Sequence, residues 1–111
     1  IEYLGKLGDK ARVQVLSYVG TGTYGSSNPN SLTFDFVPKV VHIHRKAKNK
    51  NDYYFCDFFL FYGIESDLTT TYGTGWNTIN WNAKTVSWYS TENAQQQMNH
   101  SGEKFTAIAI G

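Results

Sequence analysis

The 111-residue sequence contains one cysteine, two prolines and almost no net charge. With Cys56 alone, no disulfide can form within the chain, and its apolar neighbours predict a buried small side chain rather than a nucleophile. A formal net charge of +1 gives no general attraction to nucleic acid or membrane, so an electrostatic function would need a local patch. No apolar run approaches the roughly 20 residues of a membrane helix, and we expect no membrane insertion.

Aromatic residues, by contrast, are abundant. They make up 16% of the sequence, and hydrophobic residues make up 41%, which is enough for a chain of this length to bury one core. We therefore expect a single domain over residues 11–111, preceded by a lead-in segment or linker over residues 1–10, where two glycines interrupt the apolar residues.

The densest apolar run covers residues 53–61, in which Asp57 is the only charged side chain. Its length and aromatic content favour a strand over a helix, and the alternation of a strand places apolar side chains on both faces. We predict that this run is the central strand of the fold. A second sheet would cover one face, and a subunit partner would cover the other.

Alternating apolar and polar residues predict further strands at 11–19, 32–36, 39–45, 78–81, 85–89 and 104–110. Residues 82–84 are a hairpin turn between two of them, and residues 45–52 are a polar hairpin connection. Residues 63–75 read as a long surface loop, and residues 90–100 as one short helical turn. Six or seven hairpin-linked strands without alternating helices predict an all-β fold, an antiparallel β-sandwich.

The segment Gly20-Thr-Gly22-Thr-Tyr-Gly25 satisfies the G-x-G-x-x-G pattern of dinucleotide-binding domains. That pattern holds a pyrophosphate only where it follows a strand and opens a helix. Here a polar segment with Pro29 follows instead, so we interpret the glycines as a turn.

Several stretches resemble the small C-terminal β-sandwich domains of bacteriophage and prophage tail fibres and receptor-binding proteins, and more distantly the H-type lectins. The resemblance is carried by Phe36-Val-Pro38-Lys-Val, by the paired segments ending in Trp81 and containing Trp88, and by the closing Ala109-Ile-Gly111. It implies a homotrimer in a virion tail fibre that acts outside the host cell and binds a bacterial cell-surface carbohydrate. The polar, basic segment 42–51 departs from the pattern.

Candidate glycan-binding residues form two groups. Aromatic side chains in or beside polar loops can pack on the apolar side of a sugar ring while neighbouring amides and hydroxyls bind its hydroxyl groups. A basic connection can bind an anionic glycan, such as a phosphate-bearing wall polymer, and a trimer would triplicate it. The aromatic group is Tyr24, Tyr72, Trp76 and Tyr89, and the basic group is Arg45, Lys46, Lys48 and Lys50.

The basic group also has a simpler interpretation, a solvated loop tip. Nucleic acid is not an expected partner, because no aromatic residues interleave with these lysines.

His42 and His44 are two residues apart on a predicted strand, so both imidazoles point to the same face. Three copies around a three-fold axis would supply six nitrogens, enough for an octahedral ion such as Fe(II) or Ni(II). The alternative is that this face meets solvent and the histidines bind nothing. No other cofactor is expected.

No motif joins the titratable residues into a catalytic site. The carboxylates could pair as in a glycosidase, but their spacing does not show it, and no nucleophile is joined to a base. We therefore expect a protein that is not an enzyme. Two functions stay open: a carbohydrate-binding module, and a structural trimerisation or tail-component domain with no ligand of its own.

Overall fold

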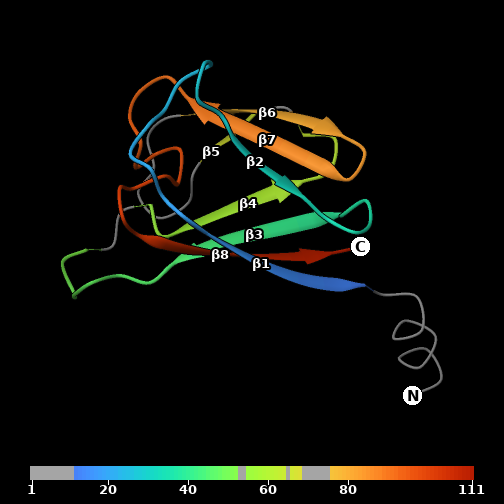
Figure 1. Cartoon of the computed structure of the whole chain (residues 1–111), viewed down its shortest axis with the longest axis horizontal. Coiled ribbons are helices and arrows are strands. Elements are labelled where there is room, and N and C mark those ends of the chain that lie inside the picture. Colours follow the sequence, from blue (N-terminus) through green and yellow to red (C-terminus); the bar gives the residue numbers. More distant parts are fainter. Residues whose placement is uncertain (1–11, 53–54, 65, 69–75) are drawn as a thin grey trace.

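The computed structural model describes residues 12–52, 55–64, 66–68 and 76–111, which form two antiparallel sheets packed face to face (Figure 1). The first sheet has the order β1 (Val13–Val19), β8 (Lys104–Ile110), β3 (Val40–Arg45) and β4 (Asp57–Phe61). The second has the order β2 (Asn30–Thr33), β7 (Thr85–Ser90), β6 (Trp76–Asn82) and β5 (Ser66–Leu68). The prediction of an antiparallel β-sandwich is confirmed, with seven longer strands and the three-residue β5.

Two sequence predictions match the strands closely. The last strand, β8, has the predicted bounds and lies between β1 and β3, so both of its edges are paired. β6 and β7 form the predicted hairpin, and the chain reverses at Ala83, which has a positive φ of 53°. Alternation along each strand was a reliable guide here because each strand buries one continuous face.

The prediction of a central strand over residues 53–61 is wrong. Among the described strands β4 pairs only with β3, so it lies at the edge of its sheet, and it begins at Asp57. Phe55 has a φ of 53°, in the left-handed region, and a strand cannot run through that conformation. Residues 53 and 54 lie outside the described part of the chain.

The predicted helical turn over residues 90–100 is also wrong, because no helix occurs among the described residues. Residues 94–98 instead form successive turns, in which the Asn99 backbone nitrogen donates to the Ala94 carbonyl oxygen at 2.9 Å. Gln96, Gln97 and Met98 are all buried, so the segment has no solvent face of the kind an amphipathic helix needs.

Two more predictions concern segments at the limits of the described chain. The predicted loop over residues 63–75 contains β5, which pairs with β6, so that prediction needs this correction. The lead-in over residues 1–10 lies outside the described residues. Within the described chain, no helix is long and apolar enough to cross a membrane.

The core between the sheets is built from aromatic side chains that contact one another across the sandwich. Trp88 of β7 is fully buried, and its ring meets the ring of Phe58 of β4 edge-on with a centroid distance of 6.0 Å. Tyr18 of β1 stacks on Phe105 of β8 at 4.9 Å. The Trp88–Phe58 contact joins the two sheets, whereas Tyr18 and Phe105 are neighbours within the first sheet. Cys56 is a buried thiol, as predicted.

The outer face of the first sheet is also apolar. Strand register aligns Val13, Ile110, Val40 and Phe61 in one row and Val15, Ile108, His42 and Phe59 in the next. Val13 is 65% exposed and Val15 is 59% exposed, whereas Leu16 and Tyr18 on the same strand pack against the core. We call these two rows the outer apolar face. No other part of the described chain covers Val13 or Val15.

Phe58 and Phe59 provide a matched test of this two-faced strand. Phe58→Ala should lower the free energy of unfolding by about 3–5 kcal/mol, because it empties a fully buried position in the core. Phe59→Ala should cost the single chain only about 1 kcal/mol, because its side chain lies on the outer face against His42. Urea unfolding of both variants measures the difference. Equal losses would contradict the assignment of the two faces.

Candidate metal and ligand sites

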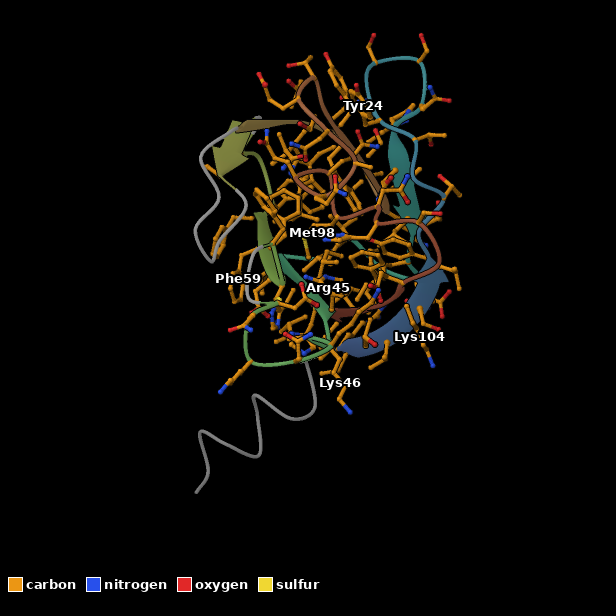
Figure 2. All side chains as sticks on the ribbon, turned by 90° about the vertical axis from the view of Figure 1, so that its left-hand side faces the viewer. Tyr24, Arg45, Lys46, Phe59, Met98 and Lys104 are labelled. Atoms are coloured by element: carbon orange, nitrogen blue, oxygen red, sulfur yellow. The ribbon has the colours of Figure 1, made fainter. Side chains whose placement is uncertain are left out.

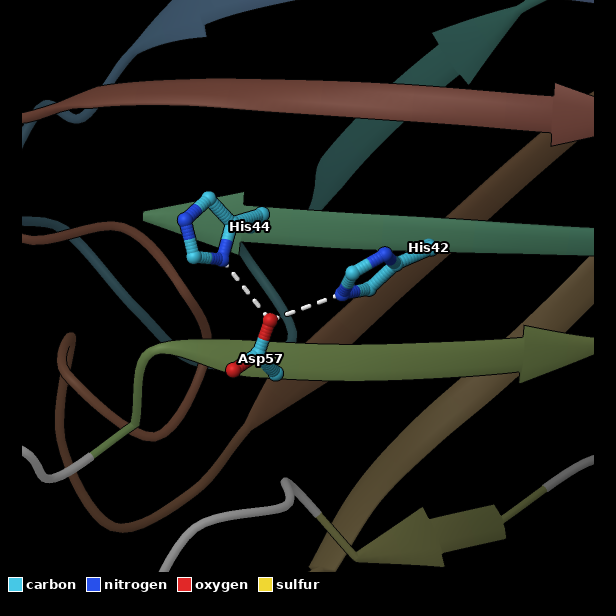
Figure 3. Close-up of side chains that lie close together, drawn as sticks. All are labelled: His42, His44 and Asp57. Carbon is cyan, nitrogen blue, oxygen red and sulfur yellow. Dashed lines mark hydrogen bonds and ion pairs between the residues drawn. The ribbon is translucent and has the colours of Figure 1, made fainter. Parts of the chain in front are cut away.

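His42, His44 and Asp57 meet on the outer face of the β3–β4 pair. His44 lies directly opposite Asp57 in the strand register, and His42 is two residues earlier on the same face. His42 Nε2 lies 2.7 Å and His44 Nδ1 lies 2.8 Å from the same carboxylate oxygen, Asp57 Oδ1 (Figure 3). The prediction that the two imidazoles share a face is confirmed. Asp57 was not predicted to join them.

The environment keeps the Asp57 carboxyl ionised. Partial burial alone would raise its pKa, but hydrogen bonds from His44 and His42 outweigh burial and leave the pKa below its ordinary value. The His42 ring is held by stacking on Phe59, with centroids 4.3 Å apart and planes inclined by 6°. Two imidazoles and a carboxylate on neighbouring strands are a donor set that divalent transition metals accept.

The structure divides the predicted basic group. Arg45 is 1% exposed, and its guanidinium makes two hydrogen bonds to the Asp52 carboxylate, at 2.8 and 3.0 Å. These bonds hold the pKa of Asp52 well below its usual range. Lys48 pairs with Glu103 at 2.9 Å. Arg45 therefore holds residues 46–52 in place through Asp52, whereas Lys46 and Lys50 are exposed.

A cavity of about 460 Å³ lies beside this ion-pair cluster. Its lining carries both signs of charge, with Arg45 and Lys48 facing Asp52 and Glu103. Burial, helped by the nearby charge of Arg45, lowers the pKa of His100 to about 4, so this imidazole is neutral at pH 7. Because its charges are paired internally, the cavity offers no excess positive charge to an anionic ligand.

The predicted aromatic group is not gathered into one site in the described chain. Tyr24 lies exposed in the loop between β1 and β2, and Tyr89 is half-buried on β7. Tyr24 and Lys46 lie toward opposite ends of the view in Figure 2, so these two residues do not share a surface there. Tyr72 and the side chain of Trp76 lie outside the described part.

Tyr24 does lie in the loop that forms a second pocket, of about 280 Å³, where β1 ends and β2 begins. Its lining contains mostly polar side chains and a few apolar ones. The lining residues are Tyr18, Val19, Thr21, Thr23, Asn28, Pro29, Asn30, Ser31, Leu32, Trp88 and Asn99. We call it the β1–β2 pocket. Sequence reasoning identified the neighbouring Tyr24 but missed Thr23, Asn28 and Ser31.

Buried amides hold the wall of the β1–β2 pocket. Gln97 is fully buried; its Oε1 accepts hydrogen bonds from the backbone nitrogens of Gly25 and Ser90, at 3.1 and 2.9 Å. Its Nε2 donates to the Asn28 carbonyl oxygen at 2.8 Å and to Asn30 Oδ1 at 3.0 Å. One side chain therefore joins the 20–29 loop, β2 and β7.

Asn99 extends this network to the start of the loop. Its Oδ1 accepts from the Thr21 backbone nitrogen at 3.0 Å, and its Nδ2 donates to the Thr23 carbonyl oxygen at 2.8 Å. Gly20 lies so close to the His100 backbone that a Cβ would overlap its carbonyl oxygen. The interpretation of the glycines as a turn is confirmed, because no helix follows them.

No protein-family model matches the chain, and it has no significant match among curated proteins or solved structures. The resemblance to tail-fibre domains therefore stays a sequence-based expectation.

Gln97→Ala should lower the free energy of unfolding by about 3–4 kcal/mol. The change leaves several buried donors and acceptors without a partner, each costing about 1–3 kcal/mol, although part of the cost is relieved when the loop moves. Gln95→Ala is the matched control; Gln95 is exposed and should change stability by less than about 0.5 kcal/mol. Denaturant unfolding of both variants measures the difference. Equal unfolding midpoints for Gln97→Ala and Gln95→Ala would contradict the role of Gln97 in the network.

Proposed function

We propose that this domain binds carbohydrate in the β1–β2 pocket without catalysing a reaction. The observation that carries the proposal is the composition of the pocket, which combines hydroxyl and amide side chains with apolar surface. A sugar needs both kinds of surface, since its hydroxyl groups require fixed donors and acceptors and its ring carbons require an apolar wall. The volume of about 280 Å³ suits a ligand of one or two sugar rings.

The pocket offers these groups on a preorganised wall. Thr23, Asn28 and Ser31 are exposed and face a ligand, while Pro29 and Leu32 supply apolar contact. The Gln97 and Asn99 amides fix the backbone that carries these side chains. A preordered loop loses less conformational entropy when a ligand binds. This saving matters most for a ligand that makes few contacts, such as a single glycan epitope.

The proposal includes a homotrimer, as the resemblance to tail-fibre domains implies. The outer apolar face supports association, because exposed apolar surface of this extent on a small domain marks an interaction surface. In a tail fibre of a bacteriophage or prophage, acting outside the host cell, the ligand would be a bacterial cell-surface glycan, and three pockets would add avidity.

Screening tag-free protein on an array of bacterial surface glycans tests the binding site. We expect binding that falls at least about tenfold in Asn28→Ala, because the change removes a polar contact worth about 1–3 kcal/mol, and less steeply in Tyr24→Ala, because Tyr24 lies in the pocket loop without lining the pocket. Tyr62→Ala is the matched control, since Tyr62 is 51% exposed and does not line the pocket. Absence of any glycan signal, or equal signals from all variants, would overturn the proposal.

The second function, a structural trimerisation domain, is favoured by the outer apolar face alone. It shares the trimer with the first proposal but needs no ligand. A trimer that binds no glycan would support this second function. A trimer that loses glycan binding in Asn28→Ala would support the first.

Light scattering tests the trimer itself. Val15→Asp places a charge at the β1 side of the outer apolar face and should convert trimer to monomer with little change in monomer stability, because Val15 is 59% exposed. Val37→Asp is the control, since Val37 is also exposed but lies in the loop between β2 and β3. Native protein that is monomeric at micromolar concentration would rule out the trimer.

A further inference from the structure

The arrangement of His42, His44 and Asp57 follows from two regularities of the β3–β4 pair. Alternation along β3 points both imidazoles outward, and the antiparallel register sets the carboxylate directly opposite His44. The three donor atoms all lie within 4.8 Å of one another. Backbone pairing between two strands, rather than loop conformation, therefore brings them together.

We propose that each protomer binds one divalent transition-metal ion of the Zn²⁺ class through His42 Nε2, His44 Nδ1 and Asp57 Oδ1. This inference does not rest on carbohydrate binding, which occurs at the separate β1–β2 pocket. It also differs from the sequence-based prediction of an ion shared on a three-fold axis, because the carboxylate completes a three-ligand set within one chain.

The distances suit an ion with small side-chain movements. Zinc takes nitrogen and carboxylate ligands at about 2.0–2.2 Å, which places tetrahedral ligand atoms about 3.4 Å from one another. The present separations from Asp57 Oδ1, 2.7 Å to His42 and 2.8 Å to His44, are hydrogen-bond distances. Rotation of exposed side chains would widen them by several tenths of an ångström as the ion replaces the bridging protons.

The surroundings favour a cation. Ser17 and Thr106 complete the row of the sheet that contains His44 and Asp57, and neither carries a positive charge. His42 is held in place by Phe59, so little side-chain entropy is lost when it becomes a ligand. The His42 and His44 side chains are 32% and 50% exposed, which leaves an approach for the ion and room for water in the remaining positions.

The site lies on a sheet face and not in a cleft, so its predicted effect is structural. An ion held by β3 and β4 together would fasten the edge strand to its neighbour. Zinc that binds the folded chain alone should raise the Tm by roughly 5 °C or more at a hundredfold excess over the Kd, and EDTA should reverse the shift.

The experiment is calorimetric titration of tag-free, EDTA-treated full chain with Zn²⁺ at neutral pH, with the ratio of ion to chain checked by native mass spectrometry. We expect one ion per chain. His44→Ala and Asp57→Asn should each weaken binding by at least about tenfold. Asp35→Asn is the matched control, because Asp35 is an exposed carboxylate in the loop between β2 and β3.

Cobalt provides a second readout that folding changes alone would not move. Co²⁺ bound to the native chain should give a visible absorption spectrum of a nitrogen- and oxygen-ligated ion, and Asp57→Asn should alter it. One ion per three chains, with no dependence on Asp57, would overturn the proposal in favour of a shared axial site. Failure of Zn²⁺ and Co²⁺ to bind, or equal binding by His44→Ala, would also overturn it.

Discussion

The pocket end of the sandwich depends on the buried amide of Gln97. This side chain satisfies two backbone nitrogens with its oxygen and binds Asn28 and Asn30 with its nitrogen, while its backbone carbonyl accepts from Trp88 Nε1 at 2.8 Å. An unsatisfied buried polar group costs about 1–3 kcal/mol, so these segments cannot separate from Gln97 without a large loss of stability. The irregular turns over residues 94–98 place the Gln97 amide in the buried space between the 20–29 loop, β2 and β7. A regular helix with one solvent face is absent from this segment.

Alternation of apolar and polar residues was enough to predict the sandwich, because a strand that buries one face has apolar residues at every second position. It failed for residues 53–61, since an apolar run shows how much surface is hidden but does not show how many strands pair with it. The left-handed conformation of Phe55, which ends the extended run, leaves no mark in a hydrophobicity pattern. It failed again at residues 94–98, where glutamines look like a solvated helix until their hydrogen-bond partners, far away in sequence, are known.

The candidate sites, too, contain some residues that alternation within a strand could place and others that depend on contacts between distant segments. Alternation within β3 placed His42 and His44 together, and the same alternation could have placed Arg45 inward with Val41 and Ile43, which is where the structure has it. Asp57 needed the register of the β3–β4 pair, which depends on how the connection after β3 folds. That connection is set by the Arg45–Asp52 pair, a contact between two residues that each looked like surface charge.

The position of Asp57 explains why β4 can be apolar on both faces and still sit at a sheet edge. A long apolar edge strand invites pairing with another chain, and a charged side chain pointing outward from the strand opposes it. Covering the neighbouring Phe59 and Phe61 would remove water from around the carboxylate, so Asp57 opposes such pairing unless its charge is compensated. The two imidazoles supply that compensation through hydrogen bonds, and a bound cation would supply more. The charge balance at His42, His44 and Asp57 therefore limits how closely a second chain can cover the outer apolar face.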